Sequence, residues 1–193
     1  DPEDYLQDDR TFGARARVGY ASADDSRSAG VSGAFRAGAF SALLAYTRRE
    51  GHELDNQGEN NAVGASRTTP VPQDAESNAV LGKLVFTPSD AHRVRFTWDH
   101  LDRNVESDVL TAVSASTASL LAQDETERDR YSLDYRYRGD GVIDGAHAAL
   151  YYQNATTRQF SAEDRTTLAD RLRDPGPLGR REAAIAGLHA APP

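Results

Sequence analysis

Strict alternation of apolar and polar side chains is the feature that most constrains the fold of this 193-residue chain. Between Arg130 and Arg138, three tyrosines and a leucine alternate with charged or small polar side chains. The stretch RVRFTWDH, from Arg93 to His100, alternates in the same way. Because successive side chains of a β-strand point to opposite faces, each stretch predicts a strand with one apolar and one charged face.

Seven segments follow this pattern, and together they predict an all-β, antiparallel, up-and-down meander. The expected strands cover about residues 11–21, 28–36, 39–48, 77–87, 93–100, 130–138 and 146–156. On the faces of the fifth and sixth strands, Val94, Phe96, Trp98, Tyr131, Leu133 and Tyr135 are expected to point outward together. The opposite, concave side is expected to carry Arg93, Arg95, Arg130, Asp134 and Arg136.

The connections between the expected strands sort by length. Long polar loops are predicted over Arg49–Glu76 and Arg103–Asp129, and a long polar segment follows the seventh strand, whereas tight turns are predicted at the second, fourth and sixth connections. Alternate connections of a meander lie at the same end, so both long loops are expected at one end of the sheet. Outer-membrane barrels show this asymmetry, with short periplasmic turns and long extracellular loops. A soluble antiparallel sheet with one solvated face is the alternative.

Composition excludes several classes of protein. No run of apolar residues approaches the ~20 that a membrane helix needs, but the strands of a β-barrel are apolar on one face only. The absence of cysteine excludes disulfides, thiolate catalysis and cysteine metal sites. A net charge of -8 with scattered Lys and Arg predicts no nucleic-acid partner.

Three stretches carry a resemblance to a known family. They are ARVGYASADDS (16–26), LLAYTRREGHELDNQGEN (43–60) and RTTPVPQDAESNAVLGKLVFTPSDAHRVRFTWDHLDRNVESDVLTA (67–112). They resemble the barrel of TonB-dependent outer-membrane receptors, in the branch of haem and haemoglobin receptors, and the likeness extends over residues 1–174. It implies the outer membrane of a Gram-negative bacterium, contact with outer-membrane lipid, the TonB system as a partner, and haem or a haem protein as the transported ligand.

The same resemblance implies an incomplete receptor. No plug domain, TonB box, FRAP motif or NPNL motif occurs in the chain, so no haem-ligating residue is carried over from the family. We therefore expect a partial barrel that begins inside a longer reading frame and neither transports nor binds haem tightly alone. Residues 175–193 are expected to form an irregular tail, as a frameshift would produce. A soluble antiparallel β-sheet binding module is the alternative function.

Individual residues offer little chemistry at the level of sequence. Among the histidines, only His52, in the first long loop, is considered as a ligand-binding residue, and a solvated loop side chain is the simpler interpretation. His100 is expected at a membrane interface, and its neighbour Asp99 on the opposite face of the strand, where the two cannot pair. No P-loop, HExxH or EF-hand pattern occurs. We therefore expect no enzyme activity, no catalytic or metal site and no resident cofactor.

Two further expectations concern the loops and the aromatic residues. Short helices are predicted over Asp108–Asp124 and, from an apparent capping box, over Ser161–Leu172. Aromatic girdles at the membrane interfaces are predicted from Trp98, Tyr131, Tyr135, Tyr137, Tyr151 and Tyr152.

Overall fold

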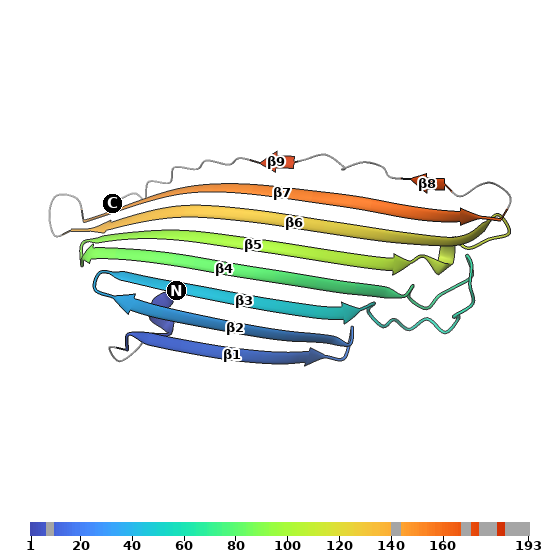
Figure 1. The fold of residues 1–193 in the computed structure, drawn as a ribbon, viewed down its shortest axis with the longest axis horizontal. Helices are drawn as coiled ribbons and strands as arrows, with labels where there is room; N and C mark the ends of the chain where they lie inside the picture. The colour runs from blue at the N-terminus through green and yellow to red at the C-terminus, as the bar shows by residue number, and fades with distance from the viewer. Residues whose placement is uncertain (7–9, 140–143, 167–170, 174–180, 184–193) are drawn as a thin grey trace.

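Seven long antiparallel strands form a single up-and-down meander, which confirms the predicted all-β fold class (Figure 1). The computed structural model describes residues 1–6, 10–139, 144–166, 171–173 and 181–183. The strands are β1 Phe12–Ala21, β2 Ser26–Ala37, β3 Phe40–His52, β4 Gln73–Ser89, β5 His92–Asp108, β6 Thr117–Arg138 and β7 Gly145–Arg165, and the short β8 Arg171–Arg173 and β9 Arg181–Ala183 both pair with β7. Within the described residues β1 and β7 do not pair, so the sheet is open, as an incomplete barrel would be.

Helical structure is limited to two short 3-10 turns among the described residues, η1 Pro2–Asp4 and η2 Leu110–Ala112. In the described part of the chain, no helix has the length and apolar character needed to cross a membrane. Of the tail expected over 175–193, only β9 lies within the described residues.

The later strands extend much further than the sequence pattern predicts. β5, β6 and β7 contain 17, 22 and 21 residues. The prediction of a long loop over Arg103–Asp129 is therefore wrong, because most of these residues form the far halves of β5 and β6. Front-facing side chains from 102 to 106 and from 123 to 129 are polar, and the adjacent Leu120 and Leu121 point to opposite faces, so the alternation that marks a half-buried strand is absent, while the backbone is still paired residue by residue.

Both predicted helices are also corrected by the structure. Within Asp108–Asp124 only η2 is helical, and β6 begins at Thr117. Within Ser161–Leu172, residues 161–165 complete β7, residues 171–173 form β8, and residues 167–170 lie outside the described chain. Pairing with a neighbouring strand satisfies these backbone groups and overrides the weak local helix signal.

The connections sort by end as predicted. The β3–β4 connection (residues 53–72) and the β5–β6 connection (residues 109–116) leave the sheet at the same end, on the right in Figure 1. The tight turns β2–β3 and β4–β5 lie at the other end, where β6 also ends and β7 begins. Gly38 in the β2–β3 turn has a φ of 57°, which glycine adopts without steric cost.

The two connections at the loop end contact each other directly. The Gly64 N–H donates to the Leu110 carbonyl oxygen at 2.9 Å, and within the β3–β4 connection Arg67 Nη1 donates to the Asn61 carbonyl at 2.7 Å. Gly64 has a φ of 107°, and a Cβ added there would lie 3.2 Å from the Val113 carbonyl oxygen. The close approach and the backbone conformation both require glycine.

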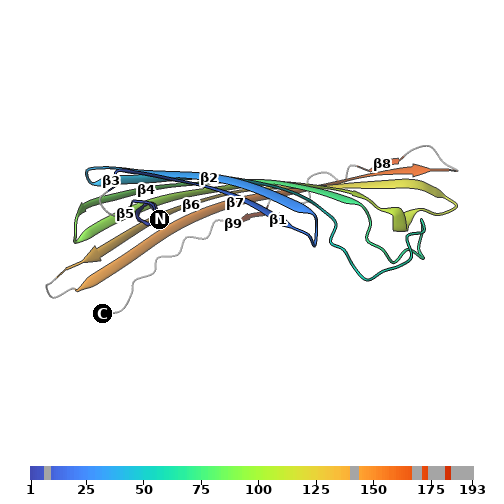
Figure 2. The same ribbon diagram turned by 90° about the horizontal axis from the view of Figure 1, so that it is seen from below.

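The N-terminal segment packs on one side of the sheet, beneath the early strands (Figure 2). Leu6, only 3% exposed, forms a small apolar cluster with Ala34 of β2 and Leu43 of β3. The Tyr5 and Ser32 hydroxyls are 2.9 Å apart and share a hydrogen bond. A Cβ on Gly13 of β1 would collide with the Tyr5 carbonyl, so glycine permits this close packing.

We predict that Gly64→Ala separates the two connections while leaving the strands paired. A side chain in this backbone conformation costs about 1–2 kcal/mol, which corresponds to roughly a tenfold faster cleavage by protease within residues 53–72. Limited proteolysis followed by mass spectrometry measures the rate, and circular dichroism checks the sheet. Ala65→Val, at an exposed neighbour, is the matched control. Equal cleavage of Gly64→Ala and the unmodified chain would contradict the role given to this contact.

Candidate functional site: a front face of two zones and a charged rear face

The register of β5 and β6 separates apolar and charged side chains onto two faces. On what we call the front face, the direct cross-strand pairs are Val94–Tyr135, Phe96–Leu133 and Trp98–Tyr131. On the rear face, which the N-terminal segment covers, they are Arg93–Arg136, Arg95–Asp134 and Asp99–Arg130. The predicted division of these side chains between two faces is confirmed.

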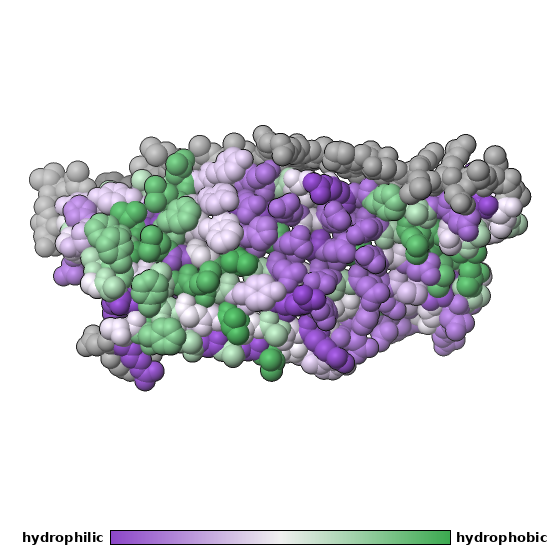
Figure 3. Space-filling model, in the orientation of Figure 1, coloured by the Kyte–Doolittle hydropathy of each residue, from purple (hydrophilic) through white to green (hydrophobic). Residues whose placement is uncertain are grey.

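An apolar band crosses the front face from β1 to β7 in the half of the sheet nearer the tight turns. It consists of the front-facing residues of 12–20, 29–35, 40–46, 80–86, 94–98, 131–137 and 146–152. Figure 3 shows hydrophobic side chains gathered over this half of the face. Its members are exposed, with Val18 at 84%, Leu44 at 61% and Leu150 at 55%. A continuous exposed apolar surface of this kind marks contact with a membrane or a partner.

Aromatic rings mark both borders of the apolar band. On the turn side, the ring centroids of Phe40 and Phe86 are 4.5 Å apart. On the loop side, the centroids of Tyr131 and Tyr152 are 6.4 Å apart, next to Trp98. Such amphipathic rings are typical of the boundary between apolar and polar surroundings.

One of the predicted girdle residues is misplaced. Tyr151 pairs with Ser132 and therefore lies on the rear face, whereas its neighbour Tyr152 faces front. Adjacent residues of a strand cannot share a face, so a Tyr-Tyr pair contributes only one ring to the band. The other five predicted girdle residues lie on the front face.

Beyond the loop-side aromatic border, the same front face becomes polar. We call the front-facing residues of 48–52, 74–78, 100–106, 123–129 and 154–158 the polar zone. Carboxylates outnumber basic groups there, and Figure 3 shows hydrophilic side chains over the middle of the face. Arg48 is one of its few cations, with Nη2 2.6 Å from Glu50 and 3.1 Å from Glu76. The pKa of Arg48 is raised, chiefly by its hydrogen bond to Glu50.

The rear face carries a network of paired charges. Lys83 Nζ is 2.9 Å and Arg95 Nη1 3.1 Å from the carboxylate of Asp1, and Arg93 Nη2 is 3.1 Å from that of Glu3. Arg95 also approaches the Asp134 carboxylate at 3.3 Å. Two acidic residues of the N-terminal segment thus neutralise basic side chains of β4 and β5, so the rear face remains polar without unpaired cations at these positions.

His52, the ligand candidate from the sequence, ends β3 on the front face at the loop end. Its Nδ1 is 3.0 Å from Asp74 Oδ1, and its side chain is 59% exposed. It borders an open hollow of about 590 Å³, whose other lining groups include the carboxylates of Glu50, Glu76 and Glu106. The surroundings of His52 are acidic and wet, and they lack the apolar walls that hold a porphyrin.

The remaining histidines occupy separate places. His92 Nδ1 is 2.9 Å from the Tyr135 hydroxyl beside the tight turns. His147 Nε2 lies 3.8 Å from Asp134 on the rear face. His189 lies outside the described residues. His52, His92 and His147 therefore do not form a common site.

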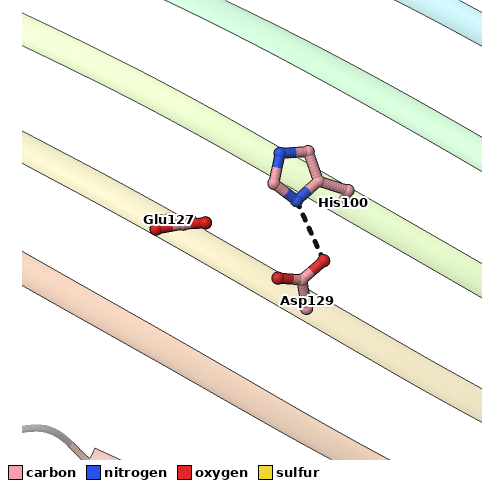
Figure 4. A group of neighbouring side chains, drawn as sticks. All are labelled: His100, Glu127 and Asp129. Atoms are coloured by element: carbon pink, nitrogen blue, oxygen red, sulfur yellow. Dashed lines mark hydrogen bonds and ion pairs between the residues drawn. The ribbon is translucent and has the colours of Figure 1, made fainter.

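His100 lies at the border between the apolar band and the polar zone. Its Nδ1 is 2.9 Å from Asp129 Oδ1 (Figure 4). Trp98 Nε1–H donates to the same oxygen at 3.2 Å. A ligand atom from each of His100, Glu127 and Asp129 lies within 4.8 Å of the other two. Asp99 points to the rear, where Arg128 donates to it at 3.1 Å, so the predicted separation of Asp99 from His100 is confirmed.

Sequence reasoning missed Asp129 and Glu127 as partners of His100. The two members of the hydrogen-bonded pair are 29 positions apart in the chain. Local spacing cannot reveal such a pair, because only the β5–β6 register aligns His100 with Asp129. The useful signal was the alternation of acidic residues on the far half of β6, which was interpreted as a loop.

No family model matches the chain. Among characterised proteins, the chain is similar to the hemoglobin-haptoglobin-binding protein A of Haemophilus influenzae, with 27% identity over 164 residues. The match covers 83% of this chain but only 15% of that protein. The chain is thus distantly related to a bacterial protein that binds hemoglobin-haptoglobin, and it spans a small part of that relative's length.

Proposed function

We propose that this chain forms part of the barrel wall of a TonB-dependent outer-membrane receptor for haem or haem proteins. The observation that carries the proposal is the front face, where an apolar band bordered by aromatic rings gives way to an acidic polar zone. The distant similarity to a hemoglobin-haptoglobin-binding protein supports the ligand class.

The height of the apolar band matches a membrane crossing. On β1 it runs from Phe12 to Tyr20, which is close to the ~9–11 residues of a tilted transmembrane strand, and on β6 it covers residues 131–137. β6 has 22 residues, which at ~3.3 Å each span roughly 70 Å, about twice the hydrocarbon thickness. The far half of the strand therefore projects from the membrane at the loop end. Short turns at one end and long strands and loops at the other correspond to the periplasmic and extracellular sides.

The soluble-module alternative has less support. A soluble sheet needs a second layer over its apolar face. The N-terminal segment packs on the rear face instead, and in the described ranges nothing covers the apolar band. In lipid, an apolar band can face its surroundings without unfavourable contact with water. The paired charges of the rear face suit a hydrated interior.

Seven strands do not close a barrel wall. An open edge in lipid leaves backbone N–H and C=O groups unpaired, each at a cost of several kcal/mol. Receptors of this class enclose a plugged lumen with 22 strands. Binding and transport are therefore assigned to a complete receptor, and the lack of tight haem binding by the chain alone stays a prediction.

We predict that Leu133→Arg strongly reduces insertion of the complete receptor into lipid vesicles. An arginine at the bilayer midplane of a barrel costs about 2–4 kcal/mol, or roughly a thirtyfold or greater loss of membrane-bound chain. Flotation of vesicles after a urea wash measures the bound fraction. Gln123→Arg places the same charge on the front face of β6 but in the polar zone, and it should insert normally. Equal insertion of both variants would argue against a lipid-facing band.

A second prediction tests the ligand class on intact cells. In bacteria that express the complete gene, replacing residues 55–70 with a short Gly-Ser linker should reduce haemoglobin binding at least several-fold, because this connection extends from the loop end. Surface labelling of an epitope in residues 109–116 checks that the receptor is displayed. If the receptor without residues 55–70 is displayed and still binds haemoglobin normally, the β3–β4 connection is not part of the ligand site. Failure of the unmodified receptor to bind haem or haemoglobin would overturn the proposed ligand.

A further inference from the structure

We propose that His100, Glu127 and Asp129 form a binding site for a first-row divalent transition-metal ion, with Zn²⁺ as the physiological candidate. This site joins β5 to β6 at the loop-side border of the apolar band. The inference rests on side-chain geometry alone and does not depend on the proposed receptor function.

The three side chains have the geometry of a metal site. All three lie on the front face, and His100 is directly opposite Asp129 in the register, with Glu127 two residues along β6. One ligand atom from each lies within 4.8 Å of the others. His100 Nδ1 and Asp129 Oδ1 are 2.9 Å apart, a few tenths of an ångström less than the edge of about 3.3–3.6 Å of a tetrahedral site with metal–ligand bonds of about 2.0–2.2 Å, so a small side-chain adjustment admits an ion.

One of the carboxylates is already oriented. Trp98 Nε1–H donates to Asp129 Oδ1 at 3.2 Å, and Asp129 is only partly exposed. Hydrogen bonds from outside the ligand set hold metal-binding carboxylates in place. A metal ion bound at His100 Nδ1 would replace the hydrogen bond between Nδ1 and Asp129, and it requires the imidazole tautomer that carries its proton on Nε2.

The local charge also favours a cation. Glu127 faces Asp102 directly across β5 and β6, and like charges in that position destabilise a sheet. Within the described part of the chain, no Lys or Arg forms an ion pair with Asp102, Glu127 or Asp129. The neighbouring Arg128 and Arg130 project to the rear face, where both approach Asp99. Because neither arginine lies on the front face, the carboxylates there keep their negative charge, and a divalent ion would offset it.

The ligand types select the class of metal. Ca²⁺ and Mg²⁺ prefer sites built from oxygen ligands alone. One imidazole nitrogen with two carboxylates suits Zn²⁺, Co²⁺ or Ni²⁺. Three protein ligands leave a coordination position open to water.

Trp98 is the single tryptophan of the chain and provides a direct reporter. The chain is prepared in detergent micelles, its β-structure is checked by circular dichroism, and residual metal is removed with EDTA. Added Co²⁺ should quench Trp98 fluorescence to saturation, because the proposed site lies beside the indole. Zn²⁺, which does not quench, should restore the fluorescence by competition.

Three variants give the proposal sharp outcomes. His100→Ala and Glu127→Gln should each weaken Co²⁺ binding at least tenfold, and Glu127→Gln keeps the shape of the side chain in case the first variant does not fold. His52→Ala removes another exposed histidine–aspartate pair from the same face and should leave binding unchanged. If Co²⁺ quenches Trp98 fluorescence in the folded chain linearly and without saturation, the proposed site is wrong. Co²⁺ affinity that is unchanged in Glu127→Gln, or that is lost in His52→Ala, would overturn it equally.

Discussion

The hydrogen-bonded register between neighbouring strands is the constraint on which the rest of this structure depends. From β1 to β7 every strand pairs with the next in antiparallel order, so each side chain is fixed to one face. A slip of one residue between β5 and β6 would bring Phe96 opposite a charged neighbour and move Asp134 to the front. The tight turns, the rear-face ion pairs and the aromatic borders all agree with a single register.

The same backbone meets two different solvents along its length. The front face of β5 carries Phe96 and Trp98 near the turns, and Asp102 and Glu106 near the loops, while the hydrogen-bonded ladder continues without interruption. The sheet is thus one structural unit with a chemical boundary across it, close to His100. The proposed barrel wall and the proposed metal site both derive from this boundary, because it brings an imidazole, an indole and carboxylates together at one level.

Sequence alternation predicted the half of the sheet that has one apolar face. It identified the seven strands, the face of Trp98 and the end at which the connections lie. It failed over residues 103–129, where apolar and polar side chains do not alternate and only cross-strand pairing defines a strand. It misplaced Tyr151 because two adjacent tyrosines were counted as one surface. The pairing of His100 with Asp129 required a register between distant segments, which local patterns do not contain.

A spin-label scan along β5, with one label at each position from 93 to 107, tests the central claim most directly. In the complete receptor reconstituted into lipid vesicles, accessibility to oxygen should alternate from 93 to 99, with maxima at Val94, Phe96 and Trp98. From Asp102 onward, front-facing labels should instead be accessible to a water-soluble nickel complex. Alternating oxygen accessibility that continues to Glu106, or none between 93 and 99, would contradict a lipid boundary at His100.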